Sequence, residues 1–173
     1  MIRAFEEYQH AYRHVAMTRE DGVLELRLHT DGGPLVWGDG PHSELGRCFW
    51  DVGSDPANRV IILTGTGNEF IGRLDDSWVG AMTPEKWNRI FTNGKRLLQA
   101  LLDIEVPVIG AVNGKATVHA ELALLSDIVR LLKYSPTVEL GMGEHRLTFS
   151  NLSSTTVPAS LLVAAPPVTT TVR

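Results

Sequence analysis

Short apolar runs and alternating stretches divide the chain into strands. Val60–Leu63 is continuously apolar and Pro107–Val112 is nearly so, which is typical of strands covered on both faces of a parallel sheet. Val23–Leu28 alternates apolar and polar residues, the period of a half-buried strand. Residues 128–132 form a fourth strand candidate.

Between these strands, apolar residues recur at the spacing expected of an α-helix. Apolar side chains recur at helical spacing over residues 42–53, and Pro56 follows the end of that segment. Thr83 suits the N-cap and Pro84 the first position of a longer helix, whose apolar face continues to about Asp103. Two shorter helices are predicted over residues 4–14 and 118–125. This alternation predicts an α/β fold with a mostly parallel sheet.

The character of the chain changes after about residue 132. Residues 150–173 carry a single charge, Arg173, and are dominated by Ser, Thr, Val, Ala and Pro without a helical period. We therefore predict a core over residues 1–132 and an atypical tail over residues 133–173, with no amphipathic helix in the last part. A change of reading frame, an artefact of cloning and a divergent terminus are all open explanations of this tail.

Composition narrows the function classes. The 173 residues allow one domain, and a net charge of -4 without a basic stripe argues against nucleic-acid binding. No apolar run is long enough to cross a membrane, and the N-terminus lacks the order of a signal peptide. The single cysteine, Cys48, indicates a reducing compartment, so we expect a cytoplasmic protein. No cluster has metal-ligand spacing, so no metal is expected.

Each buried-type strand is followed by a turn that contains glycine. After the first strand the chain reads Ile71-Gly-Arg-Leu-Asp75, and after the second it reads Asn113-Gly-Lys-Ala-Thr-Val-His-Ala-Glu121. Two such turns can aim backbone N–H groups at one carbonyl oxygen, the geometry of an oxyanion hole. We expect substrate contacts from both turns, at Gly72, Leu74, Val118 and Glu121.

These two segments resemble the crotonase (enoyl-CoA hydratase/isomerase) superfamily, over residues 22–129. In that family a strand ending in Thr-Gly carries the first oxyanion turn. A strand like Pro107–Gly114 carries the second, and a helix leading to Ser/Cys-Asp follows, here Ser126-Asp127. The resemblance implies a spiral of ββα units and a homotrimer or dimer of trimers. It also implies a C-terminal helical region, which is absent here, so we expect a fold incomplete at the C-terminus.

Departures from the common crotonase pattern point to one subgroup. Val118-His119 stands where most crotonases have Gly-Gly, while Trp37 and His42 precede or begin the first long helix. In these features the chain is similar to 6-oxocamphor hydrolase and related β-diketone hydrolases. Those enzymes cleave a carbon–carbon bond between two carbonyls in a retro-Claisen step, without coenzyme A or another cofactor. The resemblance implies a small-molecule diketone substrate.

Four side chains are catalytic candidates through this resemblance. His119 follows the second turn and could hold a developing enolate oxygen, and the indole N–H of Trp37 could orient a carbonyl without giving up its proton. His42 could assist the same carbonyl, or be an ordinary helix-start residue. His145 could act as a base, but no carboxylate follows it, so an orphaned surface histidine is favoured. For Glu121 a carboxylate facing the helix dipole is the simpler reading.

Two other functions compete with diketone hydrolysis. The chain could be an enoyl-CoA hydratase or isomerase acting on an acyl-CoA thioester, although the bulky Val118-His119 argues against the tight backbone approach that thioester binding needs. It could also be a truncated, inactive crotonase-like chain. Because His145 lacks a carboxylate and the family's C-terminal region is missing, we expect weak or absent diketone hydrolysis by this chain alone.

Overall fold

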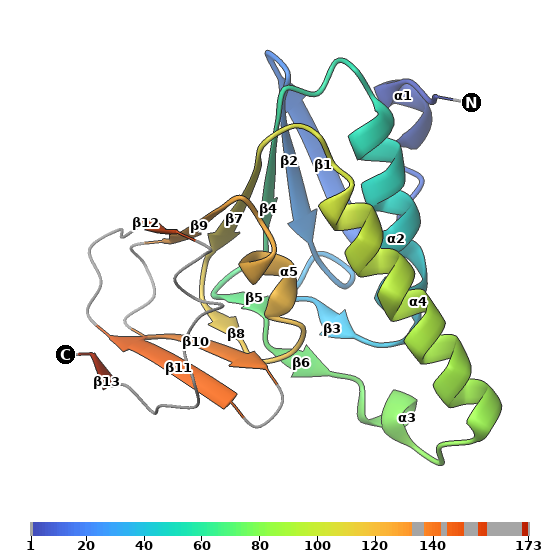
Figure 1. Cartoon of the computed structure of the whole chain (residues 1–173), viewed down its shortest axis with the longest axis vertical. Coiled ribbons are helices and arrows are strands. Elements are labelled where there is room, and N and C mark those ends of the chain that lie inside the picture. The colour runs from blue at the N-terminus through green and yellow to red at the C-terminus, as the bar shows by residue number, and fades with distance from the viewer. Residues whose placement is uncertain (1, 133–136, 143–144, 151–155, 159–170, 173) are drawn as a thin grey trace.

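The computed structural model describes residues 2–132, 137–142, 145–150, 156–158 and 171–172. Among these residues the strands form a larger sheet of six strands and a second sheet of five, besides one two-stranded pair. Two long helices, α2 (Asp39–Ser54) and α4 (Pro84–Leu102), lie together on one side of the larger sheet, and the second sheet lies below it in the view of Figure 1.

The larger sheet is parallel at its centre. Its strands are β1 (Val15–Glu20), β2 (Val23–Leu28), β4 (Val60–Thr64), β7 (Val108–Val112), β9 (Ile128–Leu131) and β12 (Thr156–Pro158). β2, β4, β7 and β9 pair in parallel, and β1 and β12 pair antiparallel at the two edges. The two apolar runs of the sequence are neighbours in this sheet, because β4 pairs with β7 in parallel and Leu63 lies opposite Gly110.

Two glycine corners lead from β4 into β5 (Glu69–Ile71) and from β7 into β8 (Lys115–Ala116). The other strands of the described residues are β3 (Val36–Trp37), β6 (Arg73–Leu74), β10 (Thr137–Met142), β11 (His145–Ser150) and β13 (Thr171–Val172). The second sheet has the order β13-β11-β10-β8-β5. A Cβ on Gly65 would lie 2.1 Å from the Glu69 oxygen, and one on Gly114 would lie 1.8 Å from the Asn68 oxygen. The amide of Asn113 joins the corners, accepting from Gly65 N–H at 3.1 Å and donating to the Gly67 oxygen at 2.8 Å. The Thr-Gly and Asn-Gly motifs therefore reflect close backbone packing between the two corners.

The helices are α1 (Phe5–Tyr8), α2 (Asp39–Ser54), α3 (Asp76–Val79), α4 (Pro84–Leu102) and α5 (Glu121–Leu124). The predicted start of α4 is confirmed, since the Thr83 hydroxyl accepts from Lys86 N–H at 3.2 Å and Pro84 occupies the first turn. At the junction of α5 with β9, the Asp127 carboxylate accepts from Val108 N–H at 2.8 Å. This bond ties the start of β7 to the start of β9.

Two predictions of secondary structure are wrong in detail. The helix predicted over residues 4–14 is only the four residues of α1, and β1, which follows it, was not predicted. The helix predicted over residues 118–125 begins at Glu121, because the chain bends at His119, where φ is 48°.

The tail lies only partly within the described residues. Those that the structure describes form strands, with β10 beside β8 and β12 beside β9. The boundary at residue 132 stays a prediction, and most of residues 150–173 lie outside the described residues. Within the described part of the chain, no helix is both long and apolar enough to cross a membrane.

Candidate active site

Three of the four predicted catalytic residues lie together. Trp37 ends β3, His42 lies in the first turn of α2, and His119 precedes α5. The Trp37 and His119 rings stack with centroids 4.0 Å apart and planes inclined by 31°. The His42 ring lies 5.8 Å from Trp37 and 5.9 Å from His119. The fold therefore gathers side chains from three separate segments into one aromatic cluster.

Trp78 completes this cluster and was not anticipated from the sequence. It lies in α3, and its ring centroid is 5.3 Å from that of His42. The carboxylate of Asp75 caps α3 by accepting from Ser77 N–H at 2.9 Å. The Asp75-Asp-Ser-Trp78 run could have indicated a short capped helix, but nothing local indicates that its indole reaches His42.

The cluster contains buried polar atoms without a hydrogen-bond partner among the described residues. They are Nε1 of Trp37, Nδ1 of His42 and Nε1 of Trp78. His42 donates from Nε2 to the Ile90 carbonyl at 2.8 Å, so in the neutral ring Nδ1 is an acceptor. Buried polar groups are normally paired, and those left unpaired often have a functional role. The cluster thus offers two indole donors and one imidazole acceptor to a ligand.

Burial controls the charge of His42. Its side chain is 3% exposed, and this loss of hydration lowers its pKa below the usual value of 6.5. The Ile90 carbonyl opposes the shift, while the nearby His119 adds to it. His42 is therefore a neutral imidazole at pH 7.

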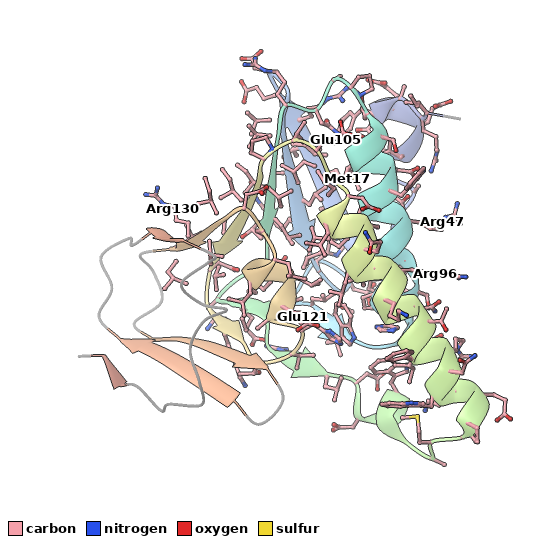
Figure 2. All side chains as sticks on the ribbon, in the orientation of Figure 1. Met17, Arg47, Arg96, Glu105, Glu121 and Arg130 are labelled. Atoms are coloured by element: carbon pink, nitrogen blue, oxygen red, sulfur yellow. The ribbon has the colours of Figure 1, made fainter. Side chains whose placement is uncertain are left out.

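His119 is held differently from His42. Its side chain is 29% exposed, and its Nδ1 is hydrogen-bonded to Oε1 of Glu121. Burial would raise the pKa of Glu121, but the hydrogen bond from His119 and its charge outweigh burial, so the pKa is lowered. Figure 2 shows Glu121 at the start of α5. The sequence favoured a carboxylate that only faces the helix dipole, whereas the structure pairs it with the site histidine.

The two turns adjoin as expected. The carbonyl of Ile71, in the first turn, accepts from the N–H groups of Thr117 and Val118, in the second turn, at 3.0 and 3.1 Å. Gly72 is the next residue after Ile71, so it lies beside this contact between the turns. Leu74 pairs with Trp37 between β6 and β3. Because the Val118 N–H is already bonded, it is not a free oxyanion donor in this arrangement. Substrate contacts at Gly72, Leu74, Val118 and Glu121 stay predictions.

His145 cannot be placed in the same way. Its backbone lies at the start of β11, opposite Met142 of β10. Its side chain lies outside the described residues, so its role as a base stays a prediction. Among the residues that the structure describes, no group of three or more His, Cys, Asp or Glu could hold a metal ion.

A hollow of about 630 Å³ lies on the helical side of the molecule. It runs between α2 and α4 and is lined by residues that include His42, Arg47, Trp50 and Arg96. Figure 2 shows Arg47 and Arg96 on the outer side of these helices. Only His42 belongs to both the hollow and the aromatic cluster. We place the candidate site at the cluster, because the unpaired polar atoms and the His119–Glu121 pair lie there.

Two carnitinyl-CoA dehydratases are similar to this chain in sequence. Carnitinyl-CoA dehydratase from Escherichia coli (strain K12) is 31% identical over 115 residues, and that from Proteus mirabilis (strain HI4320) is 32% identical over 114. Both alignments cover 65% of this chain and 43% of the relative. This chain therefore spans less than half the length of these relatives.

Solved structures share the fold. A β-diketone hydrolase from the cyanobacterium Anabaena sp. PCC 7120, bound to (S)-3-oxocyclohexyl acetic acid, is 38% identical with a TM-score of 0.73. The match covers 80% of this chain and 55% of that one. An enoyl-CoA hydratase/isomerase from Mycobacterium paratuberculosis is 21% identical with a TM-score of 0.65, over 73% of this chain and 52% of that one. The latter likeness supports the fold alone.

The family follows from these matches. The α/β architecture with its mostly parallel sheet is the crotonase fold of the solved neighbours. Residues 39–139, more than half of the chain, match the enoyl-CoA hydratase/isomerase family. The chain belongs to this family, the crotonase superfamily.

Proposed function

We propose that this chain acts as a slow, cofactor-independent hydrolase that cleaves a carbon–carbon bond in a cyclic β-diketone. The observation that carries the proposal is the Trp37–His119 stack, in which the indole Nε1 is buried and unpaired. An indole N–H can bind a carbonyl or enolate oxygen and keeps its proton. The 38% identity to a β-diketone hydrolase supports the same reaction.

The chemistry requires a water molecule, a proton carrier and donors for a developing negative charge. Water adds to one carbonyl carbon. The bond from this carbon to the α-carbon that lies between the two carbonyls then breaks, and its electron pair moves into the enolate of the other carbonyl. Trp37 and Trp78 supply uncharged N–H donors beside the site. His119, which is partly exposed, is the imidazole that solvent can reach. In this scheme the product of a cyclic diketone is a single keto acid, which carries the new carboxylic acid and the remaining ketone.

The competing function is a reaction on an acyl-CoA thioester. The carnitinyl-CoA dehydratases at 31–32% identity favour it, and Glu121 supplies a carboxylate at the site. The His119 ring argues against it, because it stands after Val118 where most crotonases have glycine and occupies space beside Trp37. We rank this function second. The homotrimer or dimer of trimers implied by the resemblance stays a prediction, as does the cytoplasmic location expected from the single cysteine.

Binding and turnover distinguish the two functions. We expect a cyclic 1,3-diketone to bind more tightly than crotonyl-CoA in calorimetry with the mass-verified 173-residue chain. If the chain hydrolyses the diketone, His119→Ala should lower the rate about a hundredfold or more. Trp37→Phe should cost less, because one hydrogen bond goes and an aromatic ring stays. Tighter binding of crotonyl-CoA would reverse the ranking, and unchanged turnover in His119→Ala would exclude His119.

A further inference from the structure

We infer that Glu121 is a positioning residue that keeps the His119 proton on Nδ1 and leaves Nε2 free to take a proton from water. This inference rests on the proposed hydrolase function for its catalytic part. It differs from the expectation that His119 donates to the enolate and that His145 is the base.

The first support is the hydrogen bond itself. Oε1 of Glu121 accepts from Nδ1 of His119, and the two side chains are 26% and 29% exposed. The pKa of Glu121 is lowered despite its burial, so the carboxylate is ionised at neutral pH. An ionised carboxylate can only accept, so the shared proton belongs to Nδ1 of His119. In a neutral imidazole the other nitrogen, Nε2, is then a lone-pair acceptor.

The second support is the way the ring is held. The Trp37 indole stacks on the His119 ring at 4.0 Å, while Glu121 fixes the Nδ1 edge. The backbone of His119 has a φ of 48°, a conformation that residues with a side chain rarely adopt. Leu122 N–H donates to the His119 carbonyl at 3.2 Å and helps to hold this bend. Such outliers persist only where the surroundings impose them, and they concentrate at functional sites.

The other ionisable groups near His119 do not replace Glu121. His42 faces the ring from α2 at 5.9 Å, but it is neutral, and its Nε2 is engaged by the Ile90 carbonyl. Asp39 lies at the start of α2 and acts on His42 through its charge. His42 is 3% exposed, so His119 is the better-placed proton carrier between the site and solvent.

The proton balance of the reaction follows. Nε2 of His119 takes a proton from water as the water oxygen bonds to the carbonyl carbon. The positive charge on the imidazolium is stabilised by the Glu121 carboxylate. When the carbon–carbon bond breaks, its electron pair forms the enolate, and Nε2 returns the proton to the enolate carbon. The new carboxylic acid then loses its proton to solvent.

Nuclear magnetic resonance tests the pair without relying on turnover. Nitrogen-15 spectra of the His119 ring, recorded above the pH at which histidine is charged, should show the proton on Nδ1 in the parent chain. Glu121→Gln should move the population toward the Nε2–H form. Glu105→Gln is the matched control, since Glu105 is exposed and distant from the site (Figure 2). A parent with the proton on Nε2, or a Glu121→Gln spectrum equal to that of the parent, would overturn the inference.

Kinetics test the catalytic part. If the parent hydrolyses a cyclic diketone, Glu121→Gln should lower kcat about a hundredfold, with KM changed by less than about threefold. Glu121→Asp, which retains a carboxylate, should recover part of the loss, and urea unfolding should verify that each variant is folded. An unchanged kcat in Glu121→Gln would refute the role. If the parent hydrolyses no diketone, the proposed function fails, while the ring spectra still decide whether Glu121 sets the tautomer.

Discussion

The buried neutral His42 should make folding stability depend on pH below the usual histidine pKa of 6.5. In the folded chain the ring is 3% exposed, its Nε2 donates to the Ile90 carbonyl, and its Nδ1 has no described partner. Burial lowers its folded pKa below 6.5, while in the unfolded chain the ring titrates near the usual value. As pH falls through this range, the unfolded chain binds the proton more readily than the folded chain. The free energy of unfolding should therefore fall with falling pH.

The slope of the unfolding free energy against pH has an upper bound for a single titrating group. One proton taken up only by the unfolded chain gives a slope of about 1.4 kcal/mol per pH unit, reached below the unfolded pKa and above the folded one. At pH above about 7 both states are neutral at His42, and the slope should vanish. The carboxylates with lowered pKa add their own loss only as pH falls toward about 4.5, so they do not obscure the effect of His42. They are Asp55, Asp75, Glu85 and Glu121.

Urea unfolding at several pH values measures this slope. The variant His42→Gln removes the titrating ring and keeps a donor for the Ile90 carbonyl, so the difference in slope between parent and variant isolates His42. His10→Gln serves as the control, because His10 is exposed. Equal slopes in the parent and His42→Gln, or a parent that gains stability as pH falls from 7 to 5, would refute the argument.

Two further predictions concern α2 and α4. Asp55→Ala should lower the free energy of unfolding by about 3 kcal/mol in urea titrations, because it removes a nearly buried carboxylate that accepts from Arg19 at 2.7 Å and from the Tyr8 hydroxyl at 2.8 Å. A loss under about 1 kcal/mol would contradict this. Gly94→Ala should raise the free energy of unfolding by about 0.5–1 kcal/mol through helix propensity. The added Cβ would lie 3.4 Å from Cε1 of His42, an ordinary contact, so a loss of stability would show that α4 cannot accept it.

The elements predicted well were those whose signals are local. The apolar runs of β4 and β7 and the Thr83-Pro84 start of α4 depend on residues adjacent in sequence, and each is present in the fold. The strand β1 was missed because it is defined by its pairing with β2 around Asp21-Gly22, where both residues have positive φ. The formation of an edge strand in a hairpin depends on the strand it pairs with as much as on its own alternation of apolar and polar residues.

By itself, the sequence determined the order of the four central strands and the two long helices, the glycine corners and the candidacy of Trp37, His42 and His119. Periodicity, capping residues and turn glycines act over a few neighbouring residues, so they can be read along the chain. Only the tertiary structure decided that Trp78 joins the cluster and that Glu121 pairs with His119. It also decided that His42 is neutral. Burial and ring contacts depend on atoms brought together from distant segments, and these set both the protonation states and the hydrogen bonds of the site.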